Sequence, residues 1–250
     1  MTEHLTSTHF GFQSVKLSEK EHLVAEVFRS VAPHYDIMND LMSFGIHRLW
    51  KRYTIALSQV RLGQCVLDLA AGSGDLTRLL LQRTGATGHV VCSDINDAML
   101  SVGRDRLLNE GLVENLDFVQ ADACALPFAD NSFHCITMAF GLRNVTDQLS
   151  ALSNIYRVCK PGGKIMVLEF SAPKNAALKM VYDAYSFKVL PAIGQLIAKD
   201  AGSYRYLAES IRRHPPQEEL KSLIEQVGFS DCRYHNLTGG IVALHIAYKY

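Results

Sequence analysis

Short apolar runs alternate with amphipathic stretches through the middle of the chain. The apolar runs are five to eight residues long and cover residues 65–69, 89–94, 116–120, 133–140 and 164–170. Runs of this length between turn residues are typical of buried strands. Residues 76–81, 98–110 and 147–158, which lie between the runs, have the apolar spacing of helices. Strands that alternate with helices predict a parallel sheet with helices on both faces.

Local signals refine these elements. Asp97 is the expected N-terminal cap of the helix over residues 98–110, and the helix over 147–158 begins at Asp147. Residues 160–163, Lys-Pro-Gly-Gly, predict a turn before the strand over 164–170.

The N-terminal flank, residues 1–60, is predicted to be helical. Ser18 and Glu21 have the spacing of a capping box ahead of a helix, and a further helix is expected over residues 48–60.

The C-terminal flank begins with an amphipathic stretch over residues 176–190, which Pro191 is expected to end or kink. Five of its residues fall on one face: Leu178, Val181, Tyr182, Tyr185 and Val189. Helices near 204–212 and 217–227 follow. Two strand-like runs, 230–236 and 241–248, are joined through Gly239 and Gly240 and predict a hairpin that puts an antiparallel strand at the sheet edge.

These elements predict one α/β domain over residues 1–250. Its core, residues 62–250, is a doubly wound, mostly parallel sheet of seven strands with an antiparallel edge hairpin. Residues 1–60 form an N-terminal helical segment. Residues 174–215 are expected to form a helical lid around the core, although 176–198 is equally compatible with an ordinary helix packed on the core.

The loop from Asp68 to Asp75 follows the first strand of this region and holds Gly72, Ser73 and Gly74. Glycines let the backbone turn sharply there and approach a ligand closely. About 20 residues further on, Asp94 ends the next strand, where a carboxylate is placed to accept hydrogen bonds from ribose hydroxyls. Loop, spacing and acid together predict a site for an adenosine-containing cofactor.

Two cofactors compete for this loop, a nicotinamide dinucleotide and S-adenosylmethionine. Asp68 lies just before the glycines, where its charge would repel a pyrophosphate but help to hold the ammonium group of S-adenosylmethionine. Thr77 stands where the dinucleotide pattern needs its third glycine. Asp122 and Ala123 follow the third strand and are placed for adenine, although Asp122 alone also fits a turn cap. S-adenosylmethionine is therefore favoured, and a nicotinamide-dependent oxidoreductase is the alternative.

The composition limits the kinds of partner that we expect for this chain. Lysine plus arginine equals aspartate plus glutamate, at 25 each, so no basic surface for nucleic acid is expected. The six cysteines have no C-x-x-C spacing and the ten histidines no metal-binding spacing, so reduced thiols and no metal are expected. We see neither a secretory signal nor an apolar run long enough to span a membrane, and expect a cytoplasmic protein. Contact with the inner face of a membrane through apolar surface stays open.

Several segments outside the cofactor loop resemble the ubiquinone/menaquinone biosynthesis C-methyltransferase family of class I methyltransferases. The resemblance runs from about Thr8 to the C-terminus, and its segments are Tyr35–Asp40, Gly45–Lys51, Phe140–Asn144, Tyr182–Phe187 and Arg205–Ile211. It implies cofactor contacts from Ser73, Asp94, Asp122 and Ala123. Two departures from the family pattern are Ala70, where many class I enzymes have glycine, and Ala139, where some members have serine.

The resemblance implies transfer of a methyl group to a ring carbon of a prenylated quinol, either demethylmenaquinol or 2-methoxy-6-polyprenyl-1,4-benzoquinol. Arg143 follows the fourth strand at the ligand-binding end of the sheet, where a guanidinium can stabilise a phenolate. A surface ion pair is the alternative for Arg143. Asn144 is expected to orient the substrate, or a water molecule beside Arg143 that takes the phenol proton.

Three further residues, Asp36, Tyr185 and Tyr204, are candidates for bonds to the ring oxygens of the quinol. The resemblance leaves other quinone-biosynthesis enzymes and a second copy of the chain open as partners. It also leaves a non-catalytic subunit of the methyltransferase fold as an alternative function.

Overall fold

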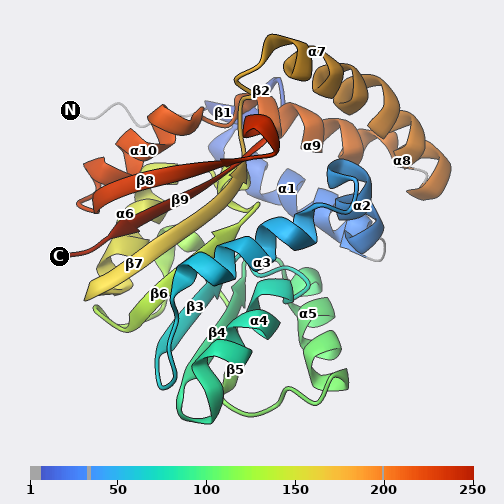
Figure 1. Cartoon of the computed structure of the whole chain (residues 1–250). Helices are drawn as coiled ribbons and strands as arrows, with labels where there is room; N and C mark the ends of the chain where they lie inside the picture. The colour runs from blue at the N-terminus through green and yellow to red at the C-terminus, as the bar shows by residue number, and fades with distance from the viewer. Residues whose placement is uncertain (1–6, 33–34, 199) are drawn as a thin grey trace.

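A computed structural model describes residues 7–32, 35–198 and 200–250 (Figure 1). Its centre is a seven-stranded sheet with the order β5-β4-β3-β6-β7-β9-β8. The strands are β3 (Cys65–Leu69), β4 (His89–Asp94), β5 (Leu116–Gln120), β6 (Phe133–Ala139), β7 (Cys159–Phe170), β8 (Ser230–Leu237) and β9 (Val242–Tyr248). This confirms the predicted fold class.

Strands β5, β4, β3, β6 and β7 are parallel to one another. β9 is antiparallel both to β7 and to β8. The antiparallel hairpin lies at the sheet edge as predicted, but the strand that runs against the others, β9, is second from the edge and β8 is outermost. The reason is that the hairpin folds back on itself, so that its second strand, not its first, extends the sheet from β7.

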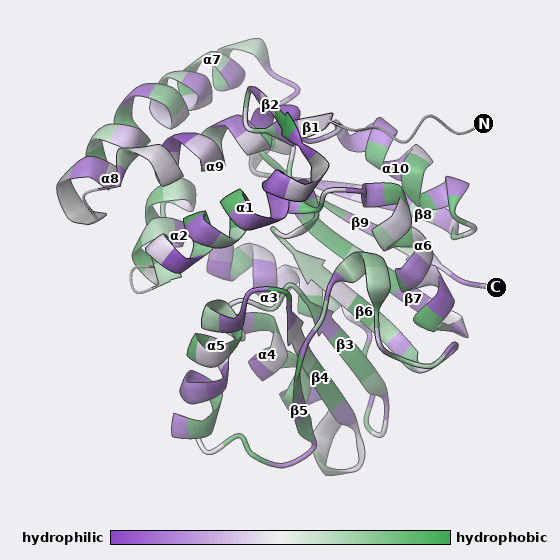
Figure 2. Cartoon of the chain, turned by 180° about the vertical axis from the view of Figure 1, so that it is seen from behind, coloured by the Kyte–Doolittle hydropathy of each residue, from purple (hydrophilic) through white to green (hydrophobic). Residues whose placement is uncertain are grey.

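Alternate side chains of the strands fill two separate cores. Val66, Val90 and Met166 pack with α3 (His47–Ser58), α4 (Asp75–Thr84) and α5 (Asp97–Asn109) on one face. Leu67, Val91 and Val167 pack with α6 (Gln148–Val158) and α10 (Gln217–Gln226) on the other. Figure 1 shows α3 crossing the front of the sheet, and Figure 2, the view from behind, shows the apolar colouring of the strands between the helices.

Two local predictions in this core were wrong. The cap of α5 is Asn96, whose side chain accepts a hydrogen bond from the Met99 N–H, and Asp97 is already helical. Residues 160–163 are not a turn before the strand but part of β7, which begins at Cys159. Gly162 and Gly163 bond to Lys249 beyond β9, so the Pro-Gly-Gly segment forms an irregularity inside the strand.

The N-terminal segment was predicted to be helical, but it also contains two strands. It begins with a hairpin of β1 (Ser7–Phe10) and β2 (Gln13–Lys16), followed by α1 (Leu17–Val31) and α2 (Tyr35–Ser43). The residue that accepts the backbone N–H of Lys16 at the start of α1 is Glu19, not Glu21. The hairpin is short, and the Phe10 ring stacks on Tyr206 of a distant helix at 4.1 Å between ring centroids. Such a non-local contact leaves no periodic signal in the local sequence.

The region after β7 forms a helical layer over the carboxyl ends of the parallel strands (Figure 1). It consists of α7 (Ala176–Ala184), a π-helical turn (Tyr185–Val189), α8 (Leu190–Ala198) and α9 (Ala201–Arg213). Pro191 does not end the helix, because it lies in the first turn of α8 directly after the π-helical turn, where the hydrogen-bond pattern already changes. Val181 and Val189 do not share the buried face of Tyr182, since their exposed fractions are 68% and 41%.

None of the helices in the described part of the chain is both long and apolar enough to cross a bilayer. All six cysteine thiols are unpaired, and four of them are buried.

Candidate functional site

A cleft opens at the carboxyl ends of β3, β4, β5 and β6. It holds about 960 Å³ of space, part of it open to solvent, and it is lined mainly by apolar side chains. The polar residues in its wall include Asp94, Asp122 and Asn144. The size and the mixture of apolar wall with few polar groups are those of a small-molecule site.

Asp94 ends β4 with its carboxylate in the wall of this cleft. One oxygen accepts the Gly72 N–H at 2.9 Å and the other accepts the Asn96 N–H at 2.9 Å. Burial raises the pKa of Asp94, and its backbone hydrogen bonds act against that shift. The carboxylate therefore ties the glycine-rich loop to the end of β4 and still faces the cleft, where it can accept hydroxyl hydrogen bonds.

The glycine-rich loop has close backbone contacts on its inner side. Gly74 caps α4 at a φ of +78°, and a Cβ there would lie 2.8 Å from Leu107. A Cβ on Gly103 of α5 would lie 2.5 Å from the carbonyl oxygen of Gly72. Gly103 was missed from the sequence, where a lone glycine in a helix gives no sign of its partner. Ala70 lines the cleft at a φ of +54°, a conformation that favours glycine, so its methyl group is a costly feature of this loop.

Asp68 lies outside the main cleft. Its side chain is buried, and it accepts hydrogen bonds from the hydroxyls of Thr77 at 2.6 Å and Thr137 at 2.8 Å. Burial raises the pKa of Asp68 to about 6, against the effect of these hydrogen bonds. A small second cavity, shared with Lys51 and Ala70, reaches the Asp68 side chain. Ser73 is also outside the main cleft, and its buried hydroxyl has no hydrogen-bond partner.

Asp122 and Ala123 both line the cleft after β5. The Asp122 side chain accepts the Cys124 N–H at 2.9 Å and so caps the 3-10 turn η3 (Ala123–Ala125). Capping and cofactor binding are compatible for Asp122, because the Cys124 N–H bonds to only one of its two carboxylate oxygens.

One wall of the cleft comes from α1, which the sequence did not connect with the cofactor loop. Glu21, Val24 and Phe28 line the cleft from this helix. The Asn96 amide donates to the Ala25 carbonyl at 3.2 Å, which fixes α1 against the end of β4. The N-terminal segment therefore completes the site.

Arg143 and Asn144 lie side by side in the 3-10 turn η4 (Leu142–Asn144) but face different surroundings. Asn144 lines the cleft and accepts a hydrogen bond from the Tyr206 hydroxyl at 3.0 Å. Arg143 is buried and forms an ion pair of 2.7 Å with Glu169 near the end of β7. The alternative of a surface ion pair was wrong, because the exposed fractions of these two side chains are 4% and 1%. The sequence analysis missed Glu169, because an acidic residue inside an apolar strand does not indicate which cation it pairs with.

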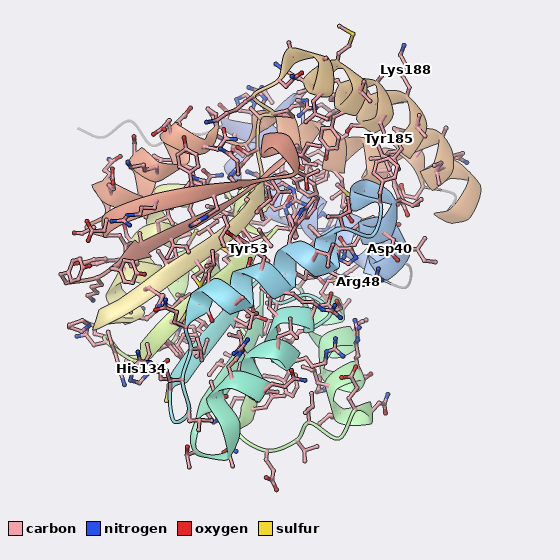
Figure 3. All side chains as sticks on the ribbon, in the orientation of Figure 1. Asp40, Arg48, Tyr53, His134, Tyr185 and Lys188 are labelled. Atoms are coloured by element: carbon pink, nitrogen blue, oxygen red, sulfur yellow. The ribbon has the colours of Figure 1, made fainter. Side chains whose placement is uncertain are left out.

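Two of the three predicted quinol-binding residues, Tyr185 and Tyr204, lie outside the cleft wall. The side chain of Asp36, in α2, is outside the described residues. The Tyr185 hydroxyl donates to the Leu41 carbonyl at 2.7 Å, so this side chain joins the π-helical turn to α2 (Figure 3). Tyr204 is 1% exposed, packs against Gly194 of α8 and has no partner for its hydroxyl.

Metal chemistry has no evident ligand set here. Within residues 7–32, 35–198 and 200–250, no three or more histidine, cysteine, aspartate or glutamate side chains are grouped so that they could hold a metal ion.

Comparison with known proteins gives a family for this chain. The model of the ubiE/COQ5 methyltransferase family matches residues 15–249. The chain belongs to this family. A relative from Legionella pneumophila strain Philadelphia 1, named ubiquinone/menaquinone biosynthesis C-methyltransferase UbiE, is 70% identical over 250 residues, which is 100% of both chains. A relative of the same name from Klebsiella pneumoniae strain 342 is 61% identical over 98% of this chain and 97% of its own.

Among solved structures, an S-adenosylmethionine-dependent methyltransferase from Aquifex aeolicus matches with a TM-score of 0.60 and 17% identity. The match covers 94% of this chain and 100% of that one, and it supports the class I methyltransferase fold. Membership of a methyltransferase family decides against the nicotinamide-dependent oxidoreductase that the glycine-rich loop left open.

Proposed function

We propose that this protein transfers the methyl group of S-adenosylmethionine to a ring carbon of a prenylated quinol in ubiquinone or menaquinone synthesis. The observation that carries the proposal is the cleft wall of Asp94, Asp122 and Asn144 in a chain that aligns end to end with relatives named for this reaction. The two quinols considered from the sequence, demethylmenaquinol and 2-methoxy-6-polyprenyl-1,4-benzoquinol, are both within the proposal.

The residues of the cleft fit the cofactor by chemistry. The Asp94 carboxylate suits the ribose hydroxyls, and Asp122 with the Ala123 N–H suits the adenine ring. At the loop, the unpartnered Ser73 hydroxyl and the Asp68 carboxylate suit the amino-acid end, with Gly72 and Gly74 shaping the backbone. The bound cofactor supplies an electrophilic sulfonium methyl group.

The protein residues must supply a nucleophilic carbon and its position. A phenolate spreads negative charge to its ortho carbon, so a cation beside the phenol oxygen favours the reactive form. Arg143 is our candidate for this role, and it cannot itself be the base because its pKa is too high. Asn144, on the cleft side of the same turn, is our candidate for orienting the ring. Positioning of two reactants contributes up to ~7–11 kcal/mol to lowering a barrier.

The redox state of the acceptor tests the mechanism. A quinone ring is electron-poor and should not react with an electrophilic methyl group, whereas the quinol has a nucleophilic carbon. We expect the purified protein to methylate dithionite-reduced quinol and to leave the oxidised quinone unchanged. Tandem mass spectrometry of the product should place the new methyl group on carbon rather than oxygen.

Two outcomes of this assay would contradict the proposal. Equal turnover of the oxidised quinone without reductant would refute a phenolate mechanism. No transfer to either quinol by protein that binds S-adenosylmethionine in calorimetry would favour the non-catalytic subunit.

We also propose that residues 174–215 act as a lid and contact the membrane that holds the prenylated substrate. The exposed face of α7 is apolar, with Met180 73% and Val181 68% exposed. Three exposed lysines flank it at Lys174, Lys179 and Lys188. Figure 3 shows Lys188 pointing away from the body of the protein. An apolar helical face between lysines suits an anionic lipid surface.

The acidic residue of this stretch does not oppose such a contact. In residues 174–198 the only acid is Asp183, and its carboxylate is paired with Arg212 of α9. The lysine charges of α7 and its continuation are therefore not neutralised on the helix that carries them.

A further inference from the structure

Buried polar side chains gather beneath α7 and α9, around Arg143 of η4 and next to the lining of the cofactor cleft. We call them the polar cluster: Arg143, Glu169, Tyr182, Ser186, Arg212 and His214. All but Arg212 are less than 9% exposed. They come from η4, from β7, from α7 with the π-helical turn that continues it, and from the end of α9, so the fold brings together four separate segments of the chain.

Arg143 is at the centre of this cluster. Its guanidinium pairs with Glu169 and lies over the Phe170 ring at 5.4 Å from the centroid. Its Nε has no hydrogen-bond partner. Burial raises the pKa of Tyr182 to about 12, and the positive charges of Arg212 and Arg143 act against this rise. Tyr182 is thus close to two cations, and the nearby Ser186 hydroxyl also acts to lower its pKa, although the two hydroxyls do not form a hydrogen bond of good geometry.

His214 is the second unusual member. It is 8% exposed, and neither of its ring nitrogens has a hydrogen-bond partner. Burial lowers the pKa of His214 to about 4; Glu169 acts to raise it, and Arg143 and His245 lower it further. The neutral ring therefore offers one donor and one acceptor to a ligand. It also forms the carboxyl-terminal cap of α9, where the helix dipole favours an added positive charge.

Unpartnered polar groups in such a number are costly unless a ligand or water completes them. The clustered hydroxyls, guanidinium and imidazole match the two oxygens of a quinol ring better than they match a prenyl chain. Because Arg143 and Asn144 are neighbours in one turn, the cluster adjoins the cleft that Asn144 lines.

We propose that the polar cluster receives the quinol head group and that His214 accepts the phenol proton. This inference rests on the proposed function. The O–H proton moves to a ring nitrogen of His214, and the phenolate formed is stabilised by Arg143. The electron pair of the ortho carbon then forms the new carbon–carbon bond while the carbon–sulfur bond breaks and leaves a thioether. Loss of the ring C–H proton restores aromaticity, and the phenolate is reprotonated, so one proton is released overall.

Glu169 fits this scheme as a positioning residue. Its negative charge favours both the guanidinium of Arg143 and an imidazolium at His214. The phenolate itself adds a further negative charge next to the ring, which favours the imidazolium at the moment when it forms.

The test compares full-length wild-type protein with His214→Gln and His214→Ala, using reduced 2-methoxy-6-polyprenyl-1,4-benzoquinol. General base catalysis contributes typically about 100- to 10,000-fold, so we expect kcat to fall at least ~100-fold with S-adenosylmethionine affinity unchanged. The acid limb of the kcat–pH profile should disappear in His214→Gln. Added imidazole should restore part of kcat in His214→Ala, which a purely structural role would not allow.

His245 provides a matched control, because it is also buried and its pKa is also lowered to about 4 by burial. Its ring bonds to the Gln217 carbonyl at 2.9 Å. His245→Ala should keep kcat within a few-fold of wild type and show no imidazole rescue. A folded His214→Gln with wild-type kcat and pH profile would overturn the proposal.

Two milder variants serve if the His214 variants do not fold. Tyr182→Phe and Ser186→Ala each remove one buried hydroxyl and should raise KM for the quinol several-fold, and an unchanged KM in both would also overturn the proposal. Wild-type protein in the same assay distinguishes failure of the proposed function from failure of this inference. If wild-type protein methylates no quinol, the proposed function is wrong. If it is active and none of the His214, Tyr182 and Ser186 variants differs from it, only this inference is wrong.

Discussion

The buried pair of Arg143 and Glu169 makes a quantitative prediction about folding. The two side chains are 4% and 1% exposed and their charged atoms are 2.7 Å apart. Removal of one partner from such a pair leaves an uncompensated buried charge and costs about 3–5 kcal/mol of unfolding free energy. We therefore expect Arg143→Met to destabilise the protein by ~3–5 kcal/mol, which for a domain of this size lowers Tm by roughly 6–20 °C.

The structure also separates the two single changes. One Glu169 carboxylate oxygen accepts the backbone N–H of Phe170 at 2.8 Å and the other accepts that of Arg143 at 3.3 Å, so a glutamine, with a single acceptor oxygen, can keep only one of these bonds. Glu169→Gln should therefore cost at least as much as Arg143→Met, because it loses one of these bonds and also leaves the buried guanidinium unpaired. The double variant Arg143→Met/Glu169→Gln removes both charges and should recover at least ~2 kcal/mol relative to Arg143→Met.

Urea unfolding followed by circular dichroism gives the four free energies of this cycle, and calorimetry gives S-adenosylmethionine affinity for each protein. Because Arg143 is absent from the cleft wall, affinity should change little while methyl transfer is lost in every Arg143 variant. A cost below ~1 kcal/mol for Arg143→Met would contradict the buried pair. Loss of cofactor affinity in a folded Arg143→Met would instead show that this side chain contacts the cofactor.

Three other predictions concern the cofactor, the pH and the membrane. Asp94→Asn should weaken S-adenosylmethionine binding by ~1–3 kcal/mol in calorimetry, and equal affinity would remove Asp94 from the site. The pKa of Asp68 is raised to about 6, so its ionisation destabilises the folded state as pH rises from ~4 to ~6. The unfolding free energy of Asp68→Asn relative to wild type should thus rise by up to ~3 kcal/mol between pH 4 and pH 7. A difference that does not change with pH would contradict this. Lys174, Lys179 and Lys188 changed to glutamate together should reduce sedimentation with vesicles containing anionic lipid, whereas Lys249→Glu should not; equal loss in both would exclude a specific face.

The central sheet could be predicted because its strands are buried on both sides. Apolar runs such as Val66–Leu67 and Val90–Cys92 are stable only when buried, and their strands end at Leu69 and Asp94, next to the cleft. The cofactor loop followed from the same logic, since residues at strand ends meet at one edge of a parallel sheet. The local sequence was therefore sufficient to predict the central strands and the glycine-rich loop.

The parts that sequence reasoning missed depend on contacts between distant segments. Glu169 reads as one more position of a buried strand until Arg143 is placed beside it, 26 residues away in the chain. His214 follows a helix and carries no motif, and its importance comes only from burial without a partner. The hairpin β1–β2 and the α1 wall of the cleft likewise depend on docking against elements far along the chain.

The turn Leu142–Asn144 has a consequence for how activity and stability are related in this fold. It places Asn144 in the cofactor cleft and Arg143 in the polar cluster, and its first residue, Leu142, is fully buried. Arg143 is held by Glu169 on the neighbouring strand, so its position depends on the same β6–β7 packing that forms the core. A guanidinium held in this way loses little rotamer freedom when a phenolate forms, which favours the transition state. The same burial means that the cationic group cannot be removed without cost to the fold, so kinetic effects of Arg143 variants are interpretable only beside their unfolding free energies.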